Sequence, residues 1–279
     1  MRIITDSAAD FTREELSQYN IRCVQTGIII GGQDYTADQL DEETFWQGLL
    51  AGESIKTSQP APEAFLREFE AAKEAGEEAV CVCISSALSG TLQSARLAAA
   101  MLNDKGIHVI DALTGAAGQK LLVLHACRLR DEGRLLAGEI TEKLNALRSR
   151  IRLFASLDTL DNLARSGRIP RAVASLGSLA QLKPLLHVTP EGKITLAGKA
   201  FGRHRAIDSL ARRIASMRID PQHPIIPLYS HTSDNCRALI KKLASLGVFA
   251  DAHLLSAIGP SIAPHIGPGA YGVTFVEAE

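Results

Sequence analysis

The sequence contains few aromatic residues, no paired-cysteine motif and no long apolar run. Aromatic residues make up 5% of the chain, and the arginines are not interleaved with them as a base-stacking surface for nucleic acid requires. Uninterrupted apolar runs, such as residues 28–30, 79–84 and 121–124, fall far short of the roughly 20 residues that span a membrane. No secretory signal is visible after Met1. These absences argue against a nucleic-acid partner, stable membrane insertion and secretion.

The five cysteines form no cofactor or redox motif. The closest pair, Cys81 and Cys83, is separated by one residue, whereas zinc knuckles and thiol redox motifs use two. The other cysteines, Cys23, Cys127 and Cys236, are scattered. We therefore expect reduced, partly buried thiols in a cytoplasmic protein without a bound metal.

The net charge of −1 conceals an uneven distribution along the chain. Residues 1–100 carry 16 acidic and 7 basic side chains, a net charge of −9. Residues 101–279 carry 15 acidic and 23 basic side chains, a net charge of +8. This asymmetry indicates either two lobes that attract each other or a basic lobe that meets an anionic partner.

Short β-branched runs alternate with helical stretches, which predicts an α/β protein with a largely parallel sheet. The predicted strands are residues 2–5, 21–30, 79–84, 107–110, 152–156, 184–188, 193–197, 225–230, 248–255 and 271–276. The predicted helices are a short one after the capping box of Thr12 and Glu15, then 41–51, 61–75, 91–103, 115–132, 137–149, 158–165, a stretch to about 181, 203–217 and 233–246. The 279 residues, of which 46% are hydrophobic, predict two domains, residues 1–150 and 151–279.

Ligands of open α/β sheets bind at the carboxyl ends of the strands, so the residues there are the candidates for a site. They are Thr5, Asp6, Ser7, Ser85, Ser86, Asp111 and Ser156. Residues 56–60, Lys-Thr-Ser-Gln-Pro, form a loop between predicted helices. Most of these groups are small hydroxyls, which suit hydrogen bonding to an anion better than acid/base catalysis.

The most informative loop is residues 85–91, Ser-Ser-Ala-Leu-Ser-Gly-Thr. Ser89 and Gly90 directly precede a predicted helix, whose positive N-terminus favours a carboxylate or a phosphate. Plain N-capping by Ser89 explains the same residues without a ligand. From the loop alone, both explanations stay open.

Two further segments carry residues that could meet a ligand. His265 lies among two prolines and two glycines in residues 264–270, and such a tight loop can approach a ligand closely or simply be exposed. Arg168, with Arg165 and Arg171, forms a local basic cluster that is either solvated or faces an anionic group.

A serine hydrolase or transferase acting on an acyl or phosphoryl ester is the competing enzyme hypothesis, with Ser89 as nucleophile and His265 as base. The chain lacks the Gly-x-Ser-x-Gly elbow, because Ala87 stands two residues before Ser89. The usual metal-hydrolase, phosphate-loop and dinucleotide-binding motifs are also missing. A protein-interaction or regulatory module is a third alternative.

Five segments together resemble the motifs of the DegV family, in that family's order and over essentially the whole chain. They are residues 4–10 (Ile-Thr-Asp-Ser-Ala-Ala-Asp), 56–60, 85–91, 166–169 (Ser-Gly-Arg-Ile) and 265–270 (His-Ile-Gly-Pro-Gly-Ala). The resemblance implies a two-domain α/β fold, with a parallel sheet in the N-terminal domain, an α/β C-terminal domain and a ligand tunnel between them.

The resemblance also implies a function, namely binding of a long-chain fatty acid and no other cofactor. Thr57 and Ser89 are then expected to hold the carboxylate, next to Ser58, Gly90 and His265. No residue is expected to be catalytic. Some members of the family present the bound acid to a separate ATP-binding kinase subunit, which forms an acyl phosphate. Arg168 and Arg203 are the expected contacts of a phosphoryl group or of that partner.

One departure from the family pattern bears on the kinase role. Phe201 stands where the family often has an arginine that can contact the head group. We therefore expect a less cationic rim, with a weaker relative affinity for acyl phosphate than in a Phe201→Arg variant.

Overall fold

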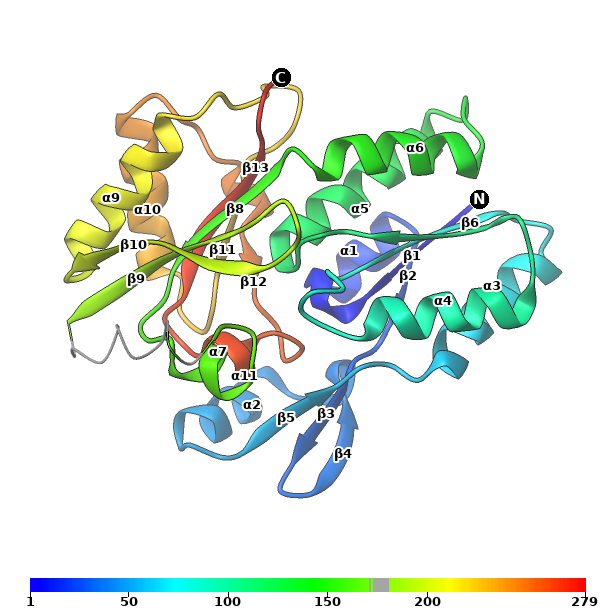
Figure 1. Ribbon diagram of the computed structural model, residues 1–279, viewed down its shortest axis with the longest axis horizontal. Coiled ribbons are helices and arrows are strands. Elements are labelled where there is room, and N and C mark those ends of the chain that lie inside the picture. The colour runs from blue at the N-terminus through cyan, green and yellow to red at the C-terminus, as the bar shows by residue number, and fades with distance from the viewer. Residues whose placement is uncertain (171, 173–180) are drawn as a thin grey trace.

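The computed structural model describes residues 1–170, 172 and 181–279, whose strands form three sheets (Figure 1). The first sheet is entirely parallel, in the order β2-β1-β6-β7. Its strands are β1 (Arg2–Asp6), β2 (Ile21–Val24), β6 (Ala79–Cys83) and β7 (Ile107–Asp111). All five residues of β6 are buried and apolar, as a central strand covered on both faces requires. The parallel sheet predicted for the N-terminal part is thus confirmed.

Helices cover both faces of this sheet. They are α1 (Arg13–Gln18), α3 (Pro62–Glu74), α4 (Thr91–Leu102), α5 (Ala116–Asp131) and α6 (Ala137–Arg148), preceded by the short helix η1 (Ser7–Ala9). The predicted capping box of Thr12 and Glu15 begins α1. Phe65 and Phe69 of α3 are fully buried and, with α4, cover one face, while α5 and α6 cover the other.

The second sheet has six strands in the order β10-β9-β8-β13-β11-β12. They are β8 (Ile151–Ser156), β9 (Leu182–Val188), β10 (Ile194–Phe201), β11 (Ile226–Tyr229), β12 (Ser256–Ala257) and β13 (Tyr271–Val276). Every neighbouring pair is antiparallel except β11 and β12. A largely parallel arrangement is therefore wrong for this half, because β9 and β10 form the predicted hairpin and β13 inserts between β8 and β11.

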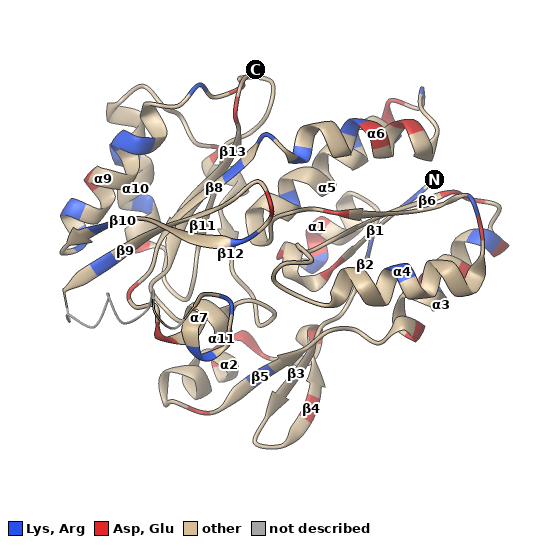
Figure 2. Cartoon of the chain, in the orientation of Figure 1, with Lys and Arg blue, Asp and Glu red and all other residues tan. Residues whose placement is uncertain are grey.

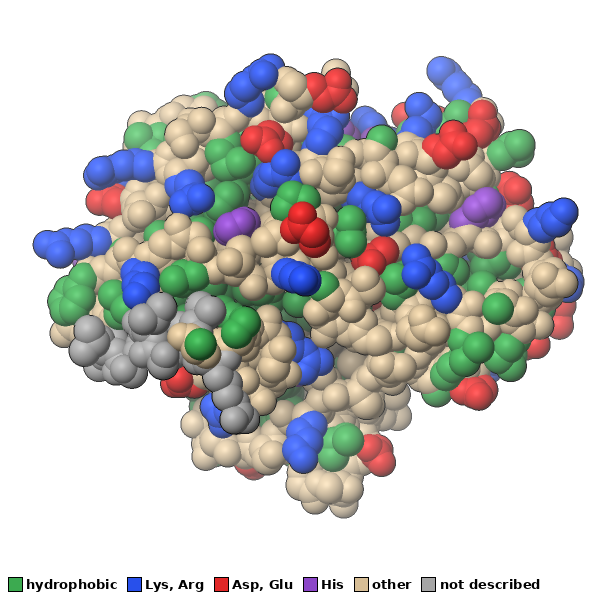
Figure 3. Space-filling view, in the orientation of Figure 1, with side chains coloured by type: hydrophobic (Ala, Val, Ile, Leu, Met, Phe, Trp, Pro, Cys, Tyr) green, Lys and Arg blue, Asp and Glu red, His purple; other side chains and the backbone are tan. Residues whose placement is uncertain are grey.

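The outer helices of this second sheet carry much of the basic charge of the C-terminal half. They are α9 (Arg203–Ala215) and α10 (Asp234–Ser245), which bury their apolar faces against the sheet. Figure 2 shows lysine and arginine residues along α9 and the β9–β10 hairpin. On the face shown in Figure 3, basic side chains are spread among acidic and hydrophobic ones.

The third sheet, β4-β3-β5, is small and antiparallel. Its strands are β3 (Gly27–Ile30), β4 (Gln33–Thr36) and β5 (Ile55–Ser58). The short helix η2 (Ala37–Gln39) and the helix α2 (Glu42–Leu50) lie between β4 and β5 in the chain. Two predictions are corrected here. Residues 21–30 form two strands in different sheets, not one extended run. Residues 56–60 begin within β5, not in a loop, because Thr57 pairs with Ile28 far along the chain.

Other boundaries also differ from the predictions. Residues 248–255 are not a strand, since the N–H of Val248 donates back to the carbonyl of Leu243 and η4 (Ala252–Leu254) precedes the two-residue β12. The helix predicted at 158–165 is shorter, α7 (Asp161–Arg165), and α11 (Ala263–Ile266) was not predicted. The helix predicted up to about residue 181 lies mostly outside the described residues.

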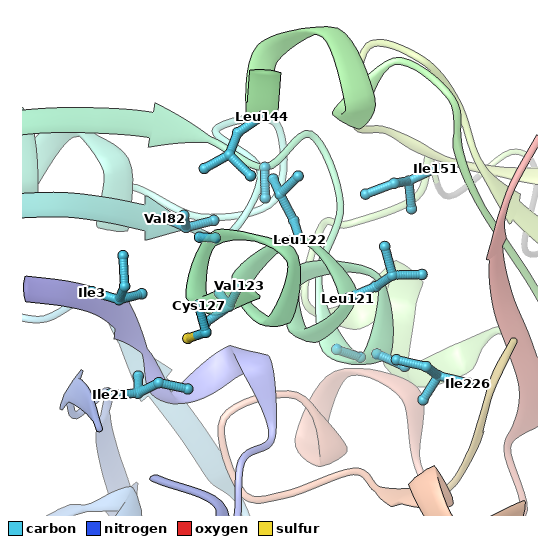
Figure 4. Close-up of a cluster of buried hydrophobic side chains, with 14 of the residues drawn as sticks. Ile3, Ile21, Val82, Leu121, Leu122, Val123, Cys127, Leu144, Ile151 and Ile226 are labelled. Atoms are coloured by element: carbon cyan, nitrogen blue, oxygen red, sulfur yellow. The ribbon is translucent and has the colours of Figure 1, made fainter. Parts of the chain in front are cut away.

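Helix α5 lies between the first two sheets (Figure 4). Its Leu122 and Cys127 are buried in one cluster with Val82 of β6, and the same cluster includes Ile151 of β8 and Ile226 of β11. One helix therefore provides core side chains to both halves of the chain, which fixes the sheets relative to each other.

Two further findings concern the cysteines and the helices. All five cysteines are free, and four of them are buried. Within the described ranges, no helix is both long and apolar enough to cross a membrane.

Candidate functional site

The fold creates a crevice at the switch point of the parallel sheet. From the central pair β1 and β6, the sheet continues to β2 on one side and to β7 on the other. The chain therefore leaves the carboxyl end of β1 toward one edge of the sheet and the carboxyl end of β6 toward the other edge. Doubly wound sheets bind ligands between two such strands. A cavity of about 460 Å³ opens there, with Ala8 and Ile84 among its lining residues. This volume is in the usual range for small-molecule sites.

The cavity wall is mainly apolar and comes from both halves of the chain. Its aliphatic side chains include Ile84, Leu88, Leu153, Leu157, Leu163, Leu186, Val188, Ile194, Leu228, Ile258, Ile262 and Ile266. Such a wall favours a ligand with a long hydrocarbon portion, because each buried methylene contributes about 0.8 kcal/mol.

The polar part of the wall contains the residues that the sequence singled out. Thr57, Ser58, Ser89, Gly90 and His265 all line the same cavity. Thr57 lies in β5 and His265 in α11, 208 positions apart, yet Thr57 Oγ1 and His265 Nε2 are 2.8 Å apart and hydrogen-bonded. The structure therefore brings together segments that the sequence analysis grouped only through the family resemblance.

His265 is mostly buried, and its pKa is lowered to about 4. The main cause is burial of the imidazole, and the positive charge of the nearby Arg168 is a smaller cause. The imidazole is therefore neutral near pH 7. A neutral ring donates from one nitrogen and accepts at the other, so its bond to Thr57 can run in either direction.

Ser89 lies just before α4 and contacts Thr91 in the first turn of that helix. Ser89 Oγ and Thr91 Oγ1 are 2.9 Å apart, and the Thr91 N–H donates to Ser89 Oγ at 3.3 Å. Thr91 is 1% exposed, so its hydroxyl is shielded from water. Ser89 is not the N-cap of α4, because Gly90 holds that position and the cap has no side-chain hydrogen bond. Ser89 Oγ instead accepts from the first N–H of the helix and also lines the cavity.

Arg168 lines the cavity next to this polar region. Its Nε donates to the carbonyl of Leu88 and its Nη1 to the carbonyl of Ser166. Partial burial lowers the pKa of the guanidinium without removing its charge. No described residue accepts a hydrogen bond from its Nη2 group.

The structure does not bring Arg203 or Phe201 into this cavity. Arg203 is exposed at the start of α9, where it donates to Asn235 Oδ1 at 3.4 Å. The Phe201 side chain is 53% exposed at the end of β10. Neither residue is among those that line the cavity, so the expected effect of Phe201 on the head-group rim has no geometric support.

Three hydroxyls that sequence reasoning did not assign to the ligand also meet at the cavity. Ser7 Oγ lies 3.0 Å from Thr26 Oγ1 and 2.8 Å from Ser261 Oγ, and the latter two residues line the cavity. In the sequence, Ser7 could be found from its place at the end of the first strand and within the family-like segment 4–10. Thr26 and Ser261 had none, because only the fold brings their segments together.

The buried Asp6 and the partly buried Asp10 support loops whose residues line the cavity. Asp6 accepts hydrogen bonds from the N–H groups of Ala8 and Ile84, and from Gln119, so it bridges the ends of β1 and β6. Asp10 accepts from the N–H of Gly259 and thereby anchors the loop that leads to Ser261. Burial raises the pKa of Asp6 to about 6 and the pKa of Asp10 to about 7.

Replacing Asp10 by asparagine is expected to change how stability depends on pH. Because the folded pKa of Asp10 is about 7 and its ordinary value is 3.8, the folded state holds a proton that the unfolded state releases between these values. The contribution of Asp10 to the free energy of unfolding therefore falls as pH rises from about 4 to 7. Asparagine still accepts from Gly259 but does not titrate.

The measurement is chemical denaturation of wild type and Asp10→Asn at pH 5 and pH 8. The stability of wild type relative to the variant should fall by about 1–3 kcal/mol over this range. The exposed Asp34→Asn serves as the control. A stability difference between wild type and Asp10→Asn that stays constant with pH would contradict the prediction.

The geometry does not favour the serine-nucleophile hypothesis. His265 Nε2 is hydrogen-bonded to Thr57, and Ser89 Oγ is engaged with Thr91. No hydrogen bond joins Ser89 to His265 within the described part of the chain, so the nucleophile–base pair that this chemistry requires is not formed. Among the described residues, no group of three His, Cys, Asp or Glu side chains is arranged to hold a metal ion.

Comparisons with known proteins agree on one family. The model of a family described as "Uncharacterised protein, DegV family" matches residues 1–278. The DegV domain-containing protein YteA of Lactococcus lactis is 31% identical over 280 residues, which cover 98% of this chain and 96% of YteA.

Solved structures of DegV proteins share the fold. A structure described as "Fatty Acid Binding of a DegV family Protein from Thermus thermophilus" covers 100% of both chains, with 31% identity and a TM-score of 0.88. The Fatty Acid Kinase (Fak) B3 protein of Streptococcus pneumoniae, loaded with linoleic acid, covers 99% of both chains, with 22% identity and a TM-score of 0.85.

Proposed function

This chain belongs to the DegV family, and from that premise we propose that it binds a long-chain fatty acid in the cavity between its two halves. The observation that carries the proposal is the composition of the cavity wall, in which aliphatic side chains surround a polar region formed by Thr57, Ser89 and His265. The fatty-acid-binding relative from Thermus thermophilus, 31% identical over the whole chain, supports it.

The energetics suit such a ligand. Burial of about 15 methylenes at roughly 0.8 kcal/mol each gives about 12 kcal/mol of gross driving force before the costs of association. The carboxylate must then be hydrogen-bonded, because an unpaired buried charge costs several kcal/mol. Thr57 and Ser89 are the donors that we assign to it, with Ser58 and Gly90 beside them.

Each of these two hydroxyls has a neighbour that can leave its proton free for the ligand. If the Nε2–H of the neutral His265 donates to Thr57 Oγ1, the Thr57 proton is available to a carboxylate. If Thr91 donates its hydroxyl proton to Ser89 Oγ, the Ser89 proton is available in the same way. A carboxylate accepts only, so its arrival selects these two donor directions.

We assign no catalytic step to this chain, and propose that it presents the carboxylate to a separate ATP-binding kinase subunit. The Fak B3 relative supports the idea of such a partner. A second hollow of about 560 Å³ shares Arg168 with the fatty-acid cavity and is also lined by Arg165 and Lys193. These cations are the side chains on this chain that we expect a phosphoryl group or an acidic partner surface to meet. The division into domains 1–150 and 151–279 remains part of this proposal.

Purified protein is expected to carry a fatty acid of 14–18 carbons, since the aliphatic wall favours an extended hydrocarbon chain. Mass spectrometry of an organic extract identifies the bound lipid. Delipidated protein should then take up the same acid in a fluorescence-displacement titration. Failure of delipidated, folded protein to bind any fatty acid would count decisively against the proposed function.

A further inference from the structure

Gln59 links the segment that carries Thr57 to α4, the helix that directly follows Ser89 and Gly90. Its Nε2 donates to Ser94 Oγ at 3.0 Å. Ser94 is 2% exposed in the first part of α4, so the receiving hydroxyl is fixed by the core. In the described part of the chain, this is the only hydrogen bond between residues 55–60 and residues 85–95.

Gly90 leaves the space that Gln59 occupies. A Cβ atom at Gly90 would lie 1.7 Å from Gln59 Oε1 and 2.7 Å from Gln59 Cδ. The backbone of Gly90 has φ −75°, which any residue can adopt. A side chain at this position would therefore displace the Gln59 amide, and it would cause no backbone strain.

The two donors expected to hold one carboxylate come from different elements. Thr57 belongs to β5, which hydrogen-bonds only to β3 within its sheet, and Ser89 precedes α4, which packs on the parallel sheet. Both hydroxyls must converge on a group only a few ångströms across, so their separation has to be set before the ligand arrives. The Gln59 amide spans the two elements at this point.

We propose that Gln59 is a positioning residue for the head group: held by Ser94 and seated against Gly90, it sets the separation of Thr57 and Ser89 for a carboxylate. The inference rests on the proposed function. Since Gln59 acts on the placement of the two donors, its loss weakens binding of a carboxylate and leaves binding of the hydrocarbon chain unchanged.

The test compares palmitic acid with 1-hexadecanol, an uncharged ligand with the same chain length, by fluorescence displacement. Gln59→Ala is expected to weaken palmitate binding about tenfold and hexadecanol binding less than about twofold. Ser94→Ala should give the same pattern. Gln93→Ala is the matched control, because Gln93 is an exposed glutamine of α4 outside the cavity.

Gly90→Ala supplies an independent arm, because it displaces the Gln59 amide without removing it. It should weaken palmitate binding in the wild-type background, yet add no further loss in a Gln59→Ala background. Equal weakening of palmitate and hexadecanol, or unchanged palmitate binding in Gln59→Ala, would overturn the inference. A wild-type protein that binds neither ligand would instead overturn the proposed function on which it rests.

Discussion

Thr57→Val and Ser89→Ala are each expected to lower the affinity for a long-chain fatty acid by about 10- to 150-fold. Each variant removes one hydrogen-bond donor from a buried charge, and such bonds contribute roughly 1.5–3 kcal/mol. Thr57→Val preserves the shape of the side chain, so the aliphatic wall of the cavity is left intact. Its remaining effect is on the partner His265, which loses its 2.8 Å contact.

The double variant should show coupling between the two sites, because both hydroxyls act on one carboxylate. Isothermal titration of delipidated protein with palmitate measures the three affinities. Ser209→Ala, an exposed serine of α9 outside the cavity, is the matched control and should bind like wild type. Variants that retain wild-type affinity would place the carboxylate elsewhere in the cavity.

Gly192→Ala is expected to lower the free energy of unfolding by about 3 kcal/mol. Gly192 has φ +77°, and a Cβ there would lie 2.1 Å from Ser85 Oγ and 3.1 Å from Leu113 Cα. The positive φ alone costs an alanine about 1–2 kcal/mol. The clash adds to this, since moving Ser85 breaks its buried 2.9 Å bond to the Gly192 carbonyl and Leu113 offers only backbone.

Gly133→Ala separates these two causes, because Gly133 also has a positive φ of +66° but nothing lies within 4 Å of its Cβ position. It should lose only the conformational part, about 1 kcal/mol. Chemical denaturation of both variants gives the comparison. Since Val188 and Ile194 flank this turn and line the cavity, Gly192→Ala should also weaken palmitate binding. Equal losses of stability at the two glycines would contradict the assigned clash.

Much of the fold could be predicted from residue patterns that act over short distances. The apolar run 79–84 predicted a buried strand, which is present as β6 (Ala79–Cys83). Thr12 with Glu15 predicted the start of a helix, which is also present. Patterns failed where pairing partners are far apart in the chain. Thr57 was predicted in a loop, because nothing in residues 55–58 reveals that Ile28 lies opposite.

In the candidate site too, some residues could be identified from the sequence and others only from the structure. Its motifs named Thr57, Ser89 and His265, and the structure places all three on one cavity. The family pattern placed residue 201 near the head group, but Phe201 is 53% exposed at the end of β10 and does not line the cavity. Ser7 was a candidate only through its place at the end of the first strand and in segment 4–10. Thr26 and Ser261 were not predicted, since their contacts with Ser7 join three separate segments.

The sequence by itself determined the family, the class of ligand expected and the residues at the ends of the parallel strands. Hydrophobic period, capping and turn chemistry act within a few residues, so one sequence is enough to detect them. Only the tertiary structure decided that α5 packs against both sheets, that Gln59 reaches Ser94 and that a side chain at Gly90 would meet Gln59. These depend on the packing of segments tens to hundreds of residues apart, where a difference of an ångström decides which atoms touch.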